Sequence, residues 1–131
     1  MPTPTERVIP VLVDEDLPAA HDCLVSAFGF APGGVEHDGE GNPVHAEIYL
    51  GEQAIWLHRA VPDMELGPPV RAEVVQGGVV VHVADVDEHC ARAKAAGAMV
   101  TREPDDQPDG QREYEARDAE GHRWWFATPT S

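Results

Sequence analysis

Residues 8–29 decide the fold, and they have the sequence VIPVLVDEDLPAAHDCLVSAFG. The segment begins with the β-branched and aliphatic residues typical of a strand, and it continues through an acidic turn. A helix is predicted over residues 17–27, with Asp16 as its N-cap and Gly29 as its stop. The apolar face of that helix is predicted to hold Leu17, Ala20, Leu24 and Phe28, which recur at helical spacing.

The same order of features recurs in residues 77–97, which have the sequence GGVVVHVADVDEHCARAKAAG. A valine-rich strand leads into an acidic turn, and a second helix is predicted over residues 86–96. Asp85 and Glu88 have the spacing of a capping box, and Gly97 has the place of the left-handed residue that ends many helices. The chain is therefore predicted to contain two copies of one unit.

Each copy is predicted to end in paired strands. The first copy has strands over residues 45–50 and 53–58, joined by a turn at residues 51–52. The second copy has strands over residues 99–102, 112–117 and 122–127, with a polar loop at 103–110 and a turn at 118–121. Neither copy can bury its sheet alone. We therefore predict one α+β domain over residues 1–131, with module one at about 6–59, a linker at about 60–76 and module two at about 77–128.

The acidic composition restricts the partners of the protein. The chain has 24 Asp and Glu residues against nine Lys and Arg residues, which gives a formal net charge of −15. Such a charge repels nucleic acid and anionic membranes, and it favours cationic partners. Cys23 and Cys90 lie in predicted helices and are expected to be reduced thiols. Residues 1–6 lack the basic start and apolar stretch of a signal peptide, so we expect a cytoplasmic protein.

Three ordered segments resemble one known superfamily. Residues 8–30 and 83–97 resemble the two modules of vicinal-oxygen-chelate proteins, and residues 112–126 resemble the closing hairpin of the glyoxalase/bleomycin-resistance branch. The resemblance implies two β-α-β-β-β modules that form a cupped mixed sheet with helices on its convex side. It also implies a homodimer with two pockets. The superfamily includes isomerases, dioxygenases, thiol transferases and antibiotic-binding proteins, so the resemblance alone does not define the function.

The resemblance also locates the positions at which enzymes of this superfamily bind a divalent metal ion. Those enzymes use four His, Gln or Glu ligands, one from each of four equivalent strand positions. The corresponding positions in this sequence are Ile9, Trp56, Gly78 and Trp125. None of these side chains can ligate a metal ion, so we predict neither the family's metal nor another cofactor. A shifted alignment would leave a metal site open, because other donors lie nearby at His45, Glu47, His58 and His82.

Strand alternation predicts which side chains surround the cup. In the first module, Trp56 is expected to share its face with His45, Glu47, Tyr49 and His58. In the second module, Trp125 is expected to share its face with Val80, His82, Arg112 and Tyr114. These residues, together with Ile9, are the candidate ligand-binding residues. Both tryptophans and both tyrosines are expected to line one concavity, while Trp124 points into the core.

Aromatic side chains bind planar rings by stacking and cations through the ring quadrupole. We therefore predict a protein that binds and sequesters an antibiotic or aromatic natural product, either bleomycin-like or anthraquinone- or enediyne-like, and confers resistance without turnover. The alternative is an isomerase, lyase or oxygenase with a non-standard or absent metal site, in which His82 or Glu47 is the general base. A third possibility is a sensor or accessory protein of a biosynthetic pathway. Trp56 and Trp125 could instead fill a dimer interface.

Overall fold

Acidic residues begin both helices, and glycines follow their ends. The computed structural model describes residues 6–72, 74 and 77–130. Residues 1–5, at the N-terminus, and residues 73, 75 and 76 of the predicted linker lie outside the described residues. Helix α1 spans Leu17–Phe28 and helix α2 spans Val86–Ala95. The Asp16 carboxylate accepts the Ala19 N–H and the Asp85 carboxylate accepts the Glu88 N–H, which confirms both predicted N-caps. Gly29 and Gly97 adopt φ angles of 80° and 90°, as expected for residues that end helices.

Eight strands complete the two units. In chain order they are β1 (Val11–Asp14), β2 (Ala31–His37), β3 (Pro43–Leu50), β4 (Gln53–Arg59), β5 (Gly78–His82), β6 (Met99–Asp106), β7 (Gln111–Arg117) and β8 (Arg123–Pro129). They form two four-stranded sheets, with the strand orders β1-β4-β3-β2 and β5-β8-β7-β6. Strand β1 pairs with β4 in parallel, and β5 pairs with β8 in parallel, whereas the other pairs are antiparallel. The predicted α+β class and the two β-α-β-β-β units are confirmed.

Two strands differ from the prediction. The sequence analysis did not predict β2, because Pro32, Gly33 and Gly34 are poor strand residues and the register of β2 shifts between Pro32 and Val35. Strand β6 continues to Asp106, through a segment that was predicted to be a polar loop. Two short 3₁₀ helices, η1 (Pro62–Met64) and η2 (Pro69–Arg71), lie between β4 and β5. None of the described helices is long and apolar enough to cross a membrane.

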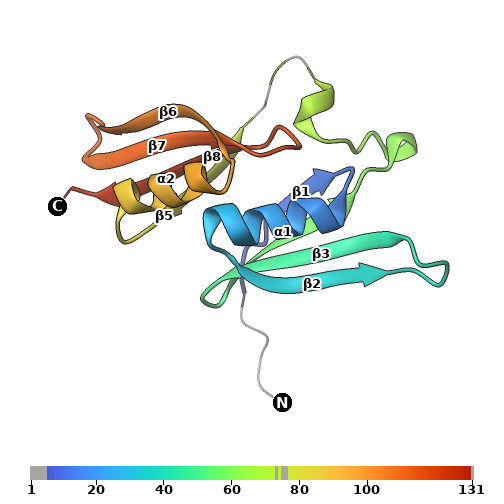
Figure 1. Cartoon of the computed structure of the whole chain (residues 1–131). Coiled ribbons are helices and arrows are strands. Elements are labelled where there is room, and N and C mark those ends of the chain that lie inside the picture. Colours follow the sequence, from blue (N-terminus) through green and yellow to red (C-terminus); the bar gives the residue numbers. More distant parts are fainter. Residues whose placement is uncertain (1–5, 73, 75–76, 131) are drawn as a thin grey trace.

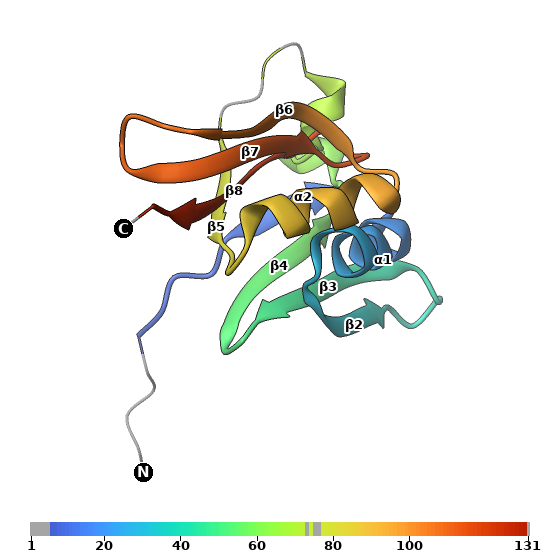
Figure 2. The same ribbon diagram turned by 60° about the vertical axis from the view of Figure 1, so that its left-hand side comes forward.

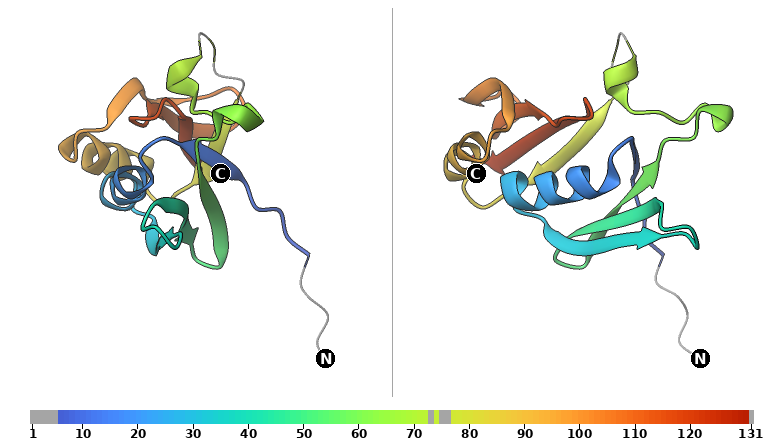
Figure 3. Two further views of the ribbon diagram at one scale, coloured as in Figure 1. Left: turned by 90° about the vertical axis from the view of Figure 1, so that its right-hand side faces the viewer. Right: turned by 45° about the vertical axis from the view of Figure 1, so that its right-hand side comes forward.

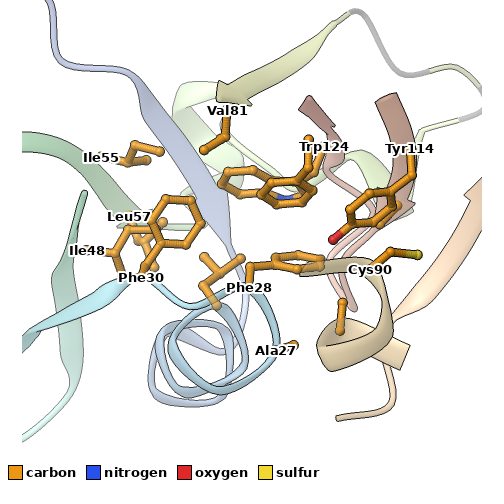
Figure 4. Close-up of a cluster of buried hydrophobic side chains, with 14 of the residues drawn as sticks. Ala27, Phe28, Phe30, Ile48, Ile55, Leu57, Val81, Cys90, Tyr114 and Trp124 are labelled. Atoms are coloured by element: carbon orange, nitrogen blue, oxygen red, sulfur yellow. The ribbon is translucent and has the colours of Figure 1, made fainter. Parts of the chain in front are cut away.

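The two modules share one hydrophobic core. Helices α1 and α2 lie side by side, with the β2–β3 side of one sheet and the β6–β7 side of the other flanking them (Figures 1, 2 and 3). Phe28, at the end of α1, contacts Trp124 of β8, with the ring centroids 5.8 Å apart (Figure 4). It also contacts Phe126 of β8, with the ring centroids 4.8 Å apart. Trp124 is completely buried, as predicted, and its indole N–H donates to Asp118 Oδ2 at 2.9 Å.

The tip of the β7–β8 hairpin also connects the modules. The Glu120 carboxylate accepts the backbone N–H groups of Glu15 and Asp16, at 3.0 and 2.9 Å. His122 Nε2 lies 2.9 Å from the Val13 carbonyl and 3.0 Å from Asp14 Oδ1. Burial raises the pKa of Asp14, and the hydrogen bond to His122 offsets this only in part. The second module therefore holds the acidic turn of the first in place.

Candidate functional site

The face of each sheet that points away from the helices carries most of the candidate ligand-binding residues. In the β3–β4 hairpin the side chains that belong to the core are Ala46, Ile48, Ile55 and Leu57, on the helix-facing side. His45 pairs with His58, and Glu47 pairs with Trp56, on the opposite side. The register follows from the two-residue turn between β3 and β4. The predicted placement of His45, Glu47, Tyr49, Trp56 and His58 on one face is confirmed.

Glu47 is the centre of a polar cluster on this face. Its carboxylate accepts the Tyr49 hydroxyl, and its Oε2 lies 2.9 Å from His45 Nε2. The edge of the His45 ring meets the Trp56 indole, with the ring centroids 5.2 Å apart. The Tyr49 and His45 hydrogen bonds lower the pKa of Glu47, so it is a carboxylate at neutral pH. The indole N–H of Trp56 is buried and has no acceptor among the described residues.

The second sheet repeats this arrangement with a different set of contacts. Glu115 pairs with Trp125 across β7 and β8, as Glu47 pairs with Trp56. The indole N–H of Trp125 donates to Glu115 Oε2 at 2.9 Å, and the Arg123 guanidinium lies 5.8 Å from the centroid of the Trp125 ring. The sequence analysis did not identify Glu115. Both open faces thus carry a glutamate–tryptophan pair at equivalent strand positions.

The predicted placement of Tyr114 and Arg112 beside Trp125 is wrong. Tyr114 pairs with Phe126, is completely buried on the helix-facing side, and its hydroxyl lies 2.6 Å from His89 Nδ1. Burial raises the pKa of the Tyr114 hydroxyl, as expected for a core residue. Arg112 forms ion pairs with Asp87 and Asp106.

The error comes from the turn between β7 and β8. It contains residues 118–122, one more than predicted, so Arg117 pairs with Arg123 and not with the preceding residue. The Asp118 carboxylate holds this turn by accepting the N–H groups of Glu120 and His122. A shift of one residue moves every side chain of a strand to the other face.

Val80 and His82 of β5 lie on the predicted face of the second sheet. Val80 pairs with Trp125 and His82 pairs with Ala127, so both share the open face of the second sheet. His82 Nε2 lies 2.7 Å from Gln111 Oε1. A Cβ atom at Gly78 would clash with the Arg123 carbonyl oxygen and would lie 2.9 Å from Trp125 Cζ3, so the missing side chain leaves room for both. In the first sheet, Ile9 is half-buried and precedes β1, which pairs with β4 at Trp56.

A cavity of about 560 Å³ lies between the two sheets. It is lined by Arg7, Val8, Pro10, Phe30, Leu50, Glu52, Gln53, Ala54, Ile55, Val79, Val80, Val81 and His82. Phe30, Ile55 and Val81 form its inner wall and also belong to the core (Figure 4). Ala54 precedes Trp56 on the same face of β4, and Val80 adjoins Trp125, but neither indole lines the cavity. The predicted single concavity shared by all four aromatic residues is therefore wrong for the single chain.

The donor set does not fit the metal ion of the superfamily's enzymes. In the described ranges of the chain, no three His, Cys, Asp or Glu side chains are grouped so that they could hold a metal ion. Glu47 and Glu115, which pair with Trp56 and Trp125, are each held by hydrogen bonds from neighbouring side chains.

Both the sequence and the structure of the chain are similar to those of known proteins. A family model described as the Glyoxalase/Bleomycin resistance protein/Dioxygenase superfamily matches residues 8–126. The structure is similar to that of TioX from Micromonospora sp. ML1, with 32% sequence identity, a TM-score of 0.74, and coverage of 95% of this chain and 99% of TioX. It also resembles a glyoxalase-related enzyme from Fulvimarina pelagi, with 22% identity, a TM-score of 0.69, and coverage of 94% and 87%.

Curated sequences show a similar level of identity. The uncharacterized protein Mb0911c of Mycobacterium bovis is 32% identical over 123 residues, which cover 92% of this chain and 81% of the relative. The uncharacterized protein Rv0887c of Mycobacterium tuberculosis is also 32% identical over 123 residues, covering 92% of this chain and 72% of the relative.

Proposed function

Because the chain belongs to the glyoxalase/bleomycin resistance protein/dioxygenase superfamily, we propose that it binds a planar aromatic small molecule and releases it unchanged. The ligand class is an antibiotic or related natural product, such as an anthraquinone- or enediyne-like compound. Sequestration of such a compound would confer resistance. The observation that carries the proposal is the glutamate–tryptophan pair on each open sheet face, Glu47 with Trp56 and Glu115 with Trp125.

These pairs suit binding by stacking. Both tryptophans are half-buried, so each keeps part of an aromatic surface available to a ligand. A stacked aromatic contact stabilises a complex by about 0.5–1.5 kcal/mol beyond the apolar area that it buries. The Glu115 carboxylate fixes the plane of the Trp125 ring through the indole N–H.

The contacts of the two candidate general bases support binding over turnover. The pKa of Glu47 is lowered, and a carboxylate with a lowered pKa is a weak base at neutral pH. His82 is exposed and bonds to Gln111, and none of the described carboxylates orients its ring. A catalytic histidine is usually oriented by a third group.

We also propose that the chain forms a homodimer. Strands β1 and β5 are edge strands of their sheets, and each exposes an apolar side chain, 53% exposed at Val11 and 55% exposed at Val80. An exposed strand edge with apolar side chains favours pairing with another chain. A second copy related by a twofold axis could cover both edges at once. Such a pairing would also add walls to the open faces that carry the tryptophans.

Tryptophan fluorescence tests the binding proposal. We expect anthraquinone-2-carboxamide, a neutral planar compound, to quench the emission of the protein saturably. A variant with both Trp56→Phe and Trp125→Phe is the control, because Trp124 in the core remains its sole tryptophan. Saturable quenching in the parent and its loss in the control is the expected result. The proposal fails if neither this compound nor bleomycin produces saturable quenching in the parent.

A further inference from the structure

A second hollow, of about 420 Å³, lies beside the Glu115–Trp125 pair. It is lined by Pro69, Val70, Ala72, Met99, Thr101, Arg117, Asp118, Ala119 and Gly121. Met99 pairs with Arg117 across β6 and β7, and the Thr101 hydroxyl donates to Glu115 Oε1 at 2.9 Å. The hollow therefore continues the open face on which Trp125 lies, and the η2 segment forms its far wall.

Arg117 lines this hollow without a hydrogen-bond or ion-pair partner among the described residues. Five of the nine basic side chains, Arg71, Lys94, Arg102, Arg112 and Arg123, have a carboxylate within 4 Å. Arg117 is the one basic residue that both lines the hollow and has a buried guanidinium nitrogen. Arg117 makes no hydrogen bond or ion pair with any residue that the structure describes, although the chain has 24 acidic residues. Its Nε is buried and lacks an acceptor among the described residues, as does the Nε of Arg123 on the neighbouring strand. A buried donor without an acceptor costs free energy, which a bound anion would recover.

The surroundings of Arg117 increase this need for an anion. Arg117 lies directly opposite Arg123 across β7 and β8, and like charges in that position repel each other. The oxygens of Glu115 already accept hydrogen bonds from Trp125 and Thr101, and its nearest oxygen is 3.7 Å from Arg123 Nε. The Asp118 carboxylate accepts three hydrogen bonds within the hairpin turn and β8. Neither carboxylate pairs with Arg117.

We infer that this hollow binds the carboxylate of a planar aromatic acid whose ring stacks on Trp125. The inference rests on the proposed function and specifies the charge of the ligand. A guanidinium can bind a carboxylate with two parallel hydrogen bonds, a geometry that suits Arg117. Arg117 and Trp125 are diagonal neighbours across β7 and β8, and such neighbours lie about 7–8 Å apart. A tricyclic aromatic acid spans that distance. The cationic ligand expected from the net charge is not the ligand favoured at this face.

The test compares anthraquinone-2-carboxylate with the neutral anthraquinone-2-carboxamide by isothermal titration calorimetry. We expect the parent to bind the acid about ten- to a hundredfold more tightly, as for hydrogen bonds to a charged group. This preference should decrease as sodium chloride is raised. Arg117→Gln should abolish the preference and leave the affinity for the carboxamide within about twofold of the parent. Arg117→Lys keeps the charge but lacks the two-pronged geometry, so it should keep part of the preference.

The matched control is Arg59→Gln, which removes the same charge from an exposed residue at the end of β4. This variant should keep the preference for the acid. Equal affinity of the parent for both compounds would overturn the inference and leave the proposed function standing. An equal loss of preference in Arg59→Gln and Arg117→Gln would also overturn it, because net charge alone would then be responsible. If the parent binds neither compound, the inference is wrong, and the proposed function is wrong as well if bleomycin also fails to quench the tryptophan emission.

Discussion

Replacing Trp124 by alanine is expected to lower the free energy of unfolding by about 3–5 kcal/mol, the usual cost of removing a fully buried aromatic side chain. The Trp124 indole has no exposed surface and packs against Phe28, Phe30 and Phe126. Its removal would leave a cavity between the modules and an unpaired oxygen on Asp118. Urea unfolding followed by far-ultraviolet circular dichroism measures the change.

Trp124→Phe is the matched control for this prediction. It keeps an aromatic ring in the core but removes the hydrogen bond to Asp118, so a smaller loss of stability is expected. An unfolding midpoint of Trp124→Ala equal to that of the parent would contradict the shared core between the modules.

Replacing Trp125 by alanine is expected to weaken the binding of anthraquinone-2-carboxamide by about 2–4 kcal/mol, which is about thirty- to a thousandfold. Trp125 is half-buried on the open face, so its loss should change the stability of the fold much less than the loss of Trp124. Isothermal titration calorimetry and urea unfolding on the same samples separate the two effects.

Trp125→Phe tests whether the ring itself holds the ligand. It keeps an aromatic face but loses the hydrogen bond to Glu115, so we expect affinity between that of the parent and that of the alanine variant. Binding by Trp125→Ala as tight as by the parent would show that the open face of the second sheet is not the ligand site.

The fold could be predicted from local patterns because the two modules repeat them. Acidic N-caps and terminal glycines define both helices, and alternating residues define the β3–β4 hairpin. Strand β2 could not be predicted in the same way, since its pairing with β3 overrides the poor strand propensity of Pro32 and Gly33. The contact between Glu120 and the start of α1 joins residues more than a hundred positions apart, and no local pattern indicates it.

The faces of the strands were predicted well where a short turn sets the register. A two-residue turn fixed the faces of β3 and β4, so His45, Glu47 and Trp56 were placed correctly. The turn at residues 118–122 is one residue longer than predicted, so the pairing of β7 with β8 differs by one position from the predicted pairing. Glu115, and not Tyr114, therefore lies on the open face. A comparison of the modules could have found Glu115. Glu47 precedes Trp56 by nine residues, and Glu115 precedes Trp125 by ten.

Arg117 was missed for the same reason. With the shifted register it would have pointed away from Trp125, and its lack of an acidic partner depends on contacts that sequence alone does not give. The face on which a strand residue lies can be predicted only when the length of the adjoining turn is known, because a shift of one residue reverses the faces of the strand.

The protein is expected to hold a planar aromatic ligand without converting it. Mass spectrometry checks this on anthraquinone-2-carboxylate and its carboxamide, recovered after prolonged incubation with excess protein. The parent and the His82→Ala variant should both return each compound with its mass unchanged. A product that the parent forms, and that His82→Ala no longer forms although it still binds the compound, would contradict the claim and identify the protein as an enzyme.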